Sequence, residues 1–218
     1  MPEIKERPIL FSAPMVRAIL EGRKTVTRRA LNARVLRDIG YGVQLGECHE
    51  LPADGALHPN SIGYYTSFCP YGFPGDRLWV RESLGYDCEY GHYFAAGGAH
   101  GETVYLCSLF DDDVAETGYS YDGLLPERSV PSIHVHRQYS RVLLEITDVR
   151  VERLQDVSEE QATAEGLQAW RVTGDGGYSD DGESARDQFI DLWRDINGAS
   201  AWAANPWVWV VEFKQVTP

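Results

Sequence analysis

The spacing of apolar residues changes several times along the chain, and the first regular spacing is that of a helix. Apolar residues at i, i+3 and i+4 form one helical face made of Val16, Ile19 and Leu20. Pro14 suits the first turn of such a helix, and Gly22 suits the left-handed residue that ends it. The pattern therefore predicts a helix over residues 14–21.

Two further helices are predicted in the second half of the chain. Ser158, followed three residues later by Gln161, forms a capping box, which predicts a short helix over residues 159–165 that ends at Gly166. A longer helix is predicted over residues 185–196. Its buried face would consist of Phe189, Leu192, Trp193 and Ile196.

Strands are predicted where apolar and polar residues alternate. A turn at Pro74 and Gly75 precedes a predicted strand through residues 78–80. Residues 141–154 alternate first in one parity and then in the other, which indicates a bulge or a sharp bend near Thr147 and Asp148. A closing strand is predicted with one face made of Trp207, Trp209, Val211 and Phe213.

Two stretches show no sustained periodic pattern. Residues 85–125 are rich in glycine, tyrosine and acid, and we expect an irregular excursion there with one hairpin at about residues 103–109. Residues 174–183 are predicted to form a glycine-rich acidic loop. Short helices between bending strands predict an α+β fold, a small mixed β-barrel with covering helices. We expect a single domain over residues 1–218, with an insertion at 85–137 and a loop at 174–183.

Composition and charge narrow the class of function. No run approaches the roughly 18 apolar residues of a membrane helix, and the first ten residues lack the apolar core of a signal peptide, so we expect a cytoplasmic protein without a membrane partner. The net charge of −13 argues against non-specific coating of duplex DNA. Residues 1–37 nevertheless carry nine basic and three acidic residues, a local charge of +6. This segment could attract a small anion, a nucleotide or a single strand, or it could pair with the acidic loops.

Cysteine and histidine spacing gives little indication of a metal site. The four cysteines lie about twenty residues apart without a CxxC pair. His134 and His136 lie at strand spacing, which is a weak indication of metal binding, and ordinary polar residues are the stronger interpretation. We therefore predict neither a metal nor a cofactor.

An ordered set of five motifs, spread between residues 19 and 214, resembles the ASCH domain family, a branch of the PUA-like β-barrel superfamily. The motifs are ILEGRKTVTRR at 19–29, PGDRLWVRE at 74–82, LEITDV at 144–149, SEEQATAEG at 158–166 and VVEFK at 210–214. The layout is similar to the longer, phage- and prophage-associated members. The compact bacterial members are about half as long and have no counterpart of residues 85–137 or 174–183.

The resemblance implies an amidohydrolase. Compact ASCH enzymes hydrolyse N4-acetylcytidine to cytidine and acetate with a lysine, a threonine and a glutamate, which correspond by motif to Lys24, Thr27 and Glu165. The chain has 17 arginines and 3 lysines, and only a lysine can lose its proton and act as a base beside the Thr27 hydroxyl. Glu165 ends a helix, where the dipole disfavours a carboxylate and favours a proton-donating role.

A nucleoside would be held by stacking and by polar contacts to the edge of its base. Phe11 and Trp79 are the candidates for stacking, and Arg29 and Glu82 are the candidates for polar contacts. Two alternative functions stay open: a non-catalytic RNA or modified-base binding module, with RNA or single-stranded nucleic acid as its partner, and, third, a ribonuclease. The candidate residues also have structural interpretations, since Thr27 could be an ordinary strand residue and Lys24 and Glu165 a structural ion pair.

Overall fold

The computed structural model describes residues 3–109, 125–174 and 177–217. The chain forms two compact units, each assembled from segments that are separated in sequence. The first unit comprises Met1–Lys24, Gly75–Glu145 and Lys214–Pro218, and the second comprises Thr25–Pro74 and Ile146–Phe213. A single domain over residues 1–218 stays a prediction.

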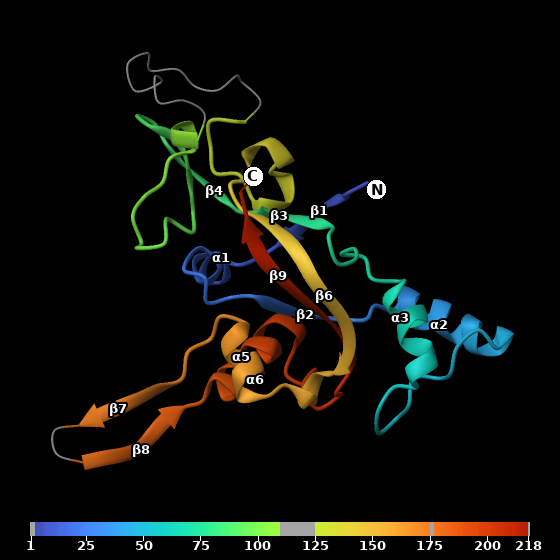
Figure 1. Ribbon diagram of the computed structural model, residues 1–218. Helices are drawn as coiled ribbons and strands as arrows, with labels where there is room; N and C mark the ends of the chain where they lie inside the picture. The colour runs from blue at the N-terminus through green and yellow to red at the C-terminus, as the bar shows by residue number, and fades with distance from the viewer. Residues whose placement is uncertain (1–2, 110–124, 175–176, 218) are drawn as a thin grey trace. The chain divides into compact units, whose positions relative to one another are not determined.

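Five strands pair in the order β1-β3-β6-β9-β2 (Figure 1). Their bounds are Glu6–Leu10 for β1, Val26–Ala30 for β2, Arg77–Arg81 for β3, Leu143–Arg153 for β6 and Trp207–Val216 for β9. β1 runs parallel to β3, whereas the β3–β6 and β2–β9 pairs are antiparallel. The mixed class of fold is therefore confirmed. The described strands form an open sheet, and no closed barrel is found among them.

The predicted helix of the first unit is confirmed as α1, Ala13–Leu20. Ser12 is its N-cap, a proline occupies the first turn, and Gly22 has a φ of 73°. That φ lies in the left-handed region, which glycine adopts without steric cost. Helix α1 buries Val16, Ala18 and Ile19, so its predicted apolar face is the one that packs.

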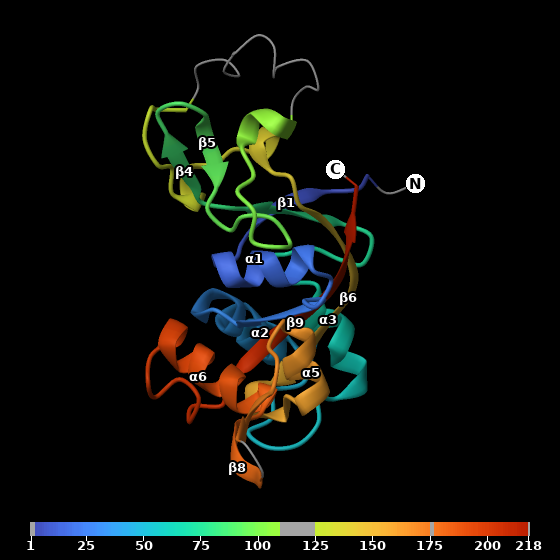
Figure 2. The same ribbon diagram turned by 90° about the vertical axis from the view of Figure 1, so that its left-hand side faces the viewer.

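The hairpin predicted at residues 103–109 is wrong, because residues Leu106–Leu109 form the 3-10 helix η2. The hairpin lies earlier, between β4, Leu84–Asp87, and β5, Gly91–Phe94 (Figure 2). Asp87 Oδ1 accepts hydrogen bonds from the N–H groups of Glu89 and Tyr90, which closes the turn. A local side-chain cap sets this hairpin, and apolar alternation does not reveal such a cap. Residues 110–124 of the predicted excursion lie outside the described residues.

The β4–β5 hairpin contributes to a small apolar core of the first unit. Its buried members are Leu84, Phe94, Leu106, Val130, Val135 and Tyr139. The last three belong to the segment that carries the 3-10 helices η3, Ser132–His134, and η4, Arg137–Tyr139. This core therefore anchors the returning segment on the β4–β5 hairpin.

The second unit contains several helices. These helices are α2, Ala33–Leu45; η1, Pro59–Ser61; α3, Ile62–Thr66; η5, Leu154–Asp156; α5, Glu159–Ala164; and α6, Ala185–Asn197. Of these, α5 and α6 pack on β2 and β9. Helices α5 and α6 lie side by side (Figures 1 and 2). Their shared core contains Val26 and Val208 from the strands and Ala162, Phe189 and Trp193 from the helices. Among the described residues, no helix combines the length and the apolar character needed to cross a membrane.

Both helix predictions in this unit are confirmed, with one error in the buried face. The capping box of α5 is complete, since Ser158 and Gln161 each accept from the other's backbone N–H. Helix α6 buries Phe189 and Trp193, but Ile196 is 65% exposed. The prediction for Ile196 is wrong because the last turn of α6 extends beyond the core.

The prediction for residues 141–154 is confirmed, and the prediction for residues 174–183 is wrong. Strand β6 is one continuous strand in which the buried parity changes between Ile146 and Val149, as predicted. The loop predicted at 174–183 is wrong, because β7, Trp170–Gly174, pairs with β8, Gly177–Glu183. A two-stranded ladder is held by backbone hydrogen bonds, which require no apolar alternation.

Two glycines of α2 provide a matched test of how closely α2 and α3 pack. A Cβ at Gly40 would meet nothing within 4 Å, whereas a Cβ at Gly42 would stand 2.3 Å from Tyr64 Oη. That hydroxyl donates to Glu47 Oε2 at 3.0 Å. We expect Gly40→Ala to stabilise the protein by about 0.5–1 kcal/mol. Gly42→Ala should be less stable than Gly40→Ala by about 1–3 kcal/mol because of overpacking. Urea unfolding measures both values, and equal stability of the two variants would contradict close packing at Tyr64.

Candidate functional site

Lys24 lies directly after the turn that ends α1. The N–H groups of Arg23 and Lys24 both donate to the Ala18 carbonyl, at 2.8 and 2.9 Å, which fixes the backbone there. Lys24 is only 3% exposed, and its Nζ lies 5.4 Å from the centroid of the Phe11 ring. Two predicted site residues are thus brought together. Burial disfavours the ammonium form of Lys24, whereas the face of the Phe11 ring stabilises it.

Thr27 lies in β2, opposite Val211 of β9, and is 3% exposed. Side chains alternate along a strand, so Thr27 shares a face of β2 with Arg29, and Arg28 leaves from the other face. Arg29 is half-buried. Burial raises the pKa of the Tyr71 hydroxyl, and the Arg29 charge acts in the opposite direction. Arg29 and Tyr71 therefore form a second polar group in this unit.

Glu165 is the C-cap of α5 and is 5% exposed. Arg28, whose side chain has no exposed surface, donates from Nη1 to Glu165 Oε1 at 3.3 Å. Its Nη2 donates to Glu152 Oε2 at 3.4 Å. The guanidinium thus holds two carboxylates of the second unit. Sequence reasoning missed this role of Arg28, because one arginine in a basic run gives no signal that it is buried.

One backbone contact joins the two motifs that carry the candidate residues. The N–H of Thr25 donates to the carbonyl of Ala164 at 2.8 Å. The residue that follows Lys24 is therefore hydrogen-bonded to the residue that precedes Glu165. Thr25 and Ala164 are about 140 residues apart in sequence, and each lies next to a residue that the ASCH resemblance implies is catalytic.

Glu82 and Trp79 lie in or next to β3, and each has an arginine partner. The Glu82 carboxylate is 3% exposed and accepts from Arg141 Nε at 3.0 Å and from Arg141 Nη2 at 2.7 Å. Burial raises the pKa of Glu82, and Arg141 opposes this shift. Trp79 is half-buried, and the Arg81 guanidinium lies 5.4 Å from the centroid of its ring. No pattern in the sequence indicates that Arg141 would bind the Glu82 carboxylate.

The described residues contain no group of three or more histidine, cysteine, aspartate or glutamate side chains that could hold a metal ion. The four cysteines are free, and Cys48 and Cys69 are buried. His134 and His136 are both exposed.

Comparison of the chain with protein-family models, with curated proteins and with solved structures found no match. Membership of the ASCH family therefore stays a prediction based on the ordered motifs. The polar chemistry of the site is the basis for assigning a reaction.

Proposed function

We propose that this protein is an amidohydrolase that removes the acyl group from N4-acylated cytosine nucleosides, converting N4-acetylcytidine to cytidine and acetate. Lys24, Thr27 and Glu165 are its catalytic residues. The observation that carries the proposal is the 3% exposure of Lys24. A lysine is almost never fully buried in a protein interior unless a partner or a function requires it. A desolvated lysine can be neutral, and a neutral amine can serve as a base.

The burial of the other two residues supports the same reaction. Thr27 and Glu165 are 3% and 5% exposed, and the hydrogen bond from Thr25 to Ala164 joins their segments. Water-excluded polar groups act on a bound substrate with less competition from solvent. A hydroxyl, an amine and a carboxyl of this kind are the groups that amide hydrolysis needs.

In the proposed reaction an oxygen nucleophile attacks the acyl carbonyl carbon, and the Lys24 amine takes the proton of that nucleophile. The carbon–nitrogen bond of the tetrahedral intermediate then breaks, and the departing N4 amine takes a proton from the Lys24 ammonium. If the nucleophile is the Thr27 hydroxyl, an acyl-threonine ester forms and water hydrolyses it. If it is a water held by Thr27, breakdown of the tetrahedral intermediate yields acetate directly and no acyl-enzyme forms. Mass spectrometry of the trapped enzyme distinguishes these two routes by an acetyl group on Thr27.

The Arg28 contact refines the role of Glu165. Arg28 Nη1 donates a charge-assisted hydrogen bond to Glu165 Oε1 at 3.3 Å. Arg28 therefore holds the Glu165 carboxyl in place beside the proposed site. The proton-donating role that the end of a helix indicates for Glu165 stays a prediction, and α5 is six residues long.

We also propose which residues hold the substrate and to which fold family the protein belongs. Phe11 contacts Lys24 and is half-buried, so its ring can contribute to stacking on a pyrimidine beside the base. The mixed five-stranded sheet, with the GRKTVT motif running into β2, is compatible with an ASCH-type barrel of the PUA-like superfamily. Trp79, Arg29 and Glu82 have less support as substrate contacts. Glu82 is bound to Arg141, and Arg29 lies near Tyr71.

The test is incubation of the purified protein with N4-acetylcytidine and its deoxy analogue, followed by chromatography for the deacylated nucleoside. We expect the wild type to release cytidine and acetate. Thr27→Val keeps the β-branched shape but lacks the hydroxyl, and we expect a rate at least about 100-fold lower. Thr25→Val is the matched control, because Thr25 is exposed and has no catalytic role in the proposal.

The outcome separates the three functions. Binding of N4-acetylcytidine without turnover would replace the amidohydrolase with the modified-base binding module. Cleavage of single-stranded RNA, with no release of cytidine from the acetylated nucleoside, would favour the ribonuclease.

A further inference from the structure

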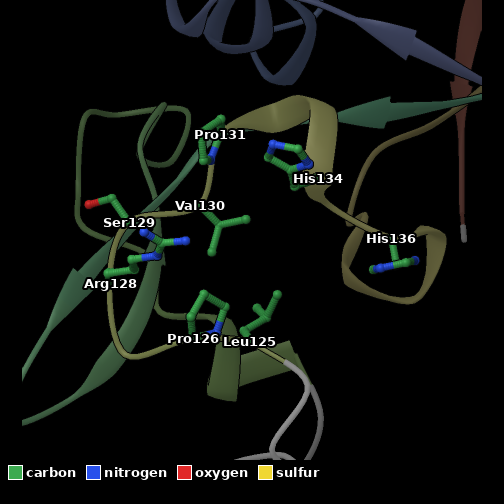
Figure 3. A pocket seen from close by; sticks show the side chains of 8 residues that line it. All are labelled: Leu125, Pro126, Arg128, Ser129, Val130, Pro131, His134 and His136. Carbon is green, nitrogen blue, oxygen red and sulfur yellow. The ribbon is translucent and has the colours of Figure 1, made fainter.

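The first unit contains a cavity of about 380 Å³ that the proposed reaction does not use (Figure 3). It is lined by residues from the segment 125–136, which follows the undescribed residues 110–124. Four of the lining side chains are apolar: Leu125, Pro126, Val130 and Pro131. The volume lies within the range typical of small-molecule sites, and the apolar wall is typical of such sites.

The backbone around this cavity is held in place by the rest of the first unit. Leu84 and Val130 exchange two backbone hydrogen bonds, of 2.9 and 2.8 Å. The Nε2 of buried His92 lies 3.0 Å from the Pro126 carbonyl oxygen and 3.1 Å from that of Arg128. Arg81 Nε donates to the carbonyl of Val135, which lies between the lining residues His134 and His136, at 3.2 Å. The walls are therefore fixed by groups that do not themselves line the cavity.

Three basic side chains on this fixed backbone line the cavity: Arg128, His134 and His136. Figure 3 shows them on different sides of it. None of the three side chains has a hydrogen-bond or ion-pair partner within the described part of the chain. Most of the described arginines donate to a carboxylate or a carbonyl, as Arg81 and Arg141 do. In a chain with a net charge of −13, three basic groups around one cavity that have no partner among the described residues require an explanation.

We infer that this cavity binds a small phosphorylated ligand of the size of a nucleoside monophosphate. The planar guanidinium of Arg128 can donate two parallel hydrogen bonds to phosphate oxygens. The imidazoles of His134 and His136 supply further ring N–H donors. The apolar wall then takes the uncharged part of the ligand. This site is independent of Lys24, Thr27 and Glu165, so the proposed deacylation can fail without affecting it.

The experiment is a titration of the full-length protein with cytidine 5′-monophosphate, with cytidine and with inorganic phosphate, followed by calorimetry and by amide chemical shifts. We expect the monophosphate to saturate and to shift the amides of the non-proline residues among 126–136, and cytidine to leave those amides unchanged. Arg128→Ala should weaken binding of the monophosphate by about tenfold or more, because a charge-assisted hydrogen bond is lost.

Arg37→Ala is the matched control, because Arg37 is also an exposed arginine without a described partner, and it lies in α2. It should leave the affinity unchanged. If both variants bind the monophosphate equally weakly, the loss of affinity reflects overall charge alone, and the proposed site is wrong. Shifts of residues 126–136 with cytidine would overturn phosphate recognition. Equal affinity for inorganic phosphate and the monophosphate would overturn the nucleotide assignment.

Discussion

Replacement of Lys24 by arginine is expected to reduce the rate of N4-acetylcytidine hydrolysis by about 10²–10⁴-fold, the range lost when a general base is removed. Arginine keeps the positive charge and can keep the contact with the Phe11 ring, which lies 5.4 Å from Lys24 Nζ. It cannot lose its proton in a protein and so cannot act as a base. The measurement is kcat/KM from chromatography of cytidine released at substrate concentrations below KM.

The control for this variant is Lys5→Arg, because Lys5 is an exposed lysine of the first unit. It makes the same chemical change and should leave the rate unchanged. Thermal unfolding of Lys24→Arg must show a folded protein, since Lys24 is buried. Retention of the rate within a few-fold by folded Lys24→Arg would show that Lys24 supplies only charge, and it would remove the base from the mechanism.

The second large effect concerns stability. Arg141→Met is expected to lower the free energy of unfolding by about 3–5 kcal/mol at neutral pH, the range found when one partner of a buried ion pair is removed. The side chains of Arg141 and Glu82 are 9% and 2% exposed. Arg141 also donates to the Gly97 carbonyl and lies 4.0 Å from the centroid of the Phe94 ring. Methionine fills much of the same space and leaves the Glu82 carboxylate buried without its partner.

The pH dependence of this variant has a definite sign. Burial already raises the pKa of Glu82 while Arg141 opposes that shift, so loss of Arg141 raises the pKa further. A carboxyl whose pKa is raised in the folded state contributes most to stability below its unfolded pKa, about 4.3, and that contribution is lost as pH rises through the folded value. The stability difference between wild type and Arg141→Met should therefore shrink as pH falls from neutral towards 4.

Urea unfolding of both proteins across this pH range is the measurement. Arg194→Met is the control, because Arg194 forms an exposed pair with Asp191 and should cost about 0–1 kcal/mol at most. If Arg141→Met loses no more stability than this control, or if its deficit grows in acid, the buried pair does not stabilise the first unit as described.

The features that were predicted correctly from sequence depend on a few neighbouring residues. The turn chemistry around α1, the capping box of α5 and the alternation in β3 and β6 are local, and they survive in any tertiary context that keeps the element. Strands β1 and β2 and helix α2 are among the elements that the apolar pattern did not reveal. Helix α2 contains Gly40 and Gly42, which weaken a helical signal, and β2 is buried at three successive positions, so it shows no alternation.

For the candidate site, too, local features could be predicted from sequence, whereas distant partners could not. The residue types and the spacing of Lys24, Thr27 and Glu165 are properties of the sequence, because motifs are local. The burial of Lys24, the partner of Glu165 and the partner of Glu82 were decided only by the tertiary structure. Arg28 and Glu165 are 137 residues apart, and Glu82 and Arg141 are 59 apart. Partners at such separations are selected by which strands and helices pack together, and that selection depends on the whole chain at once.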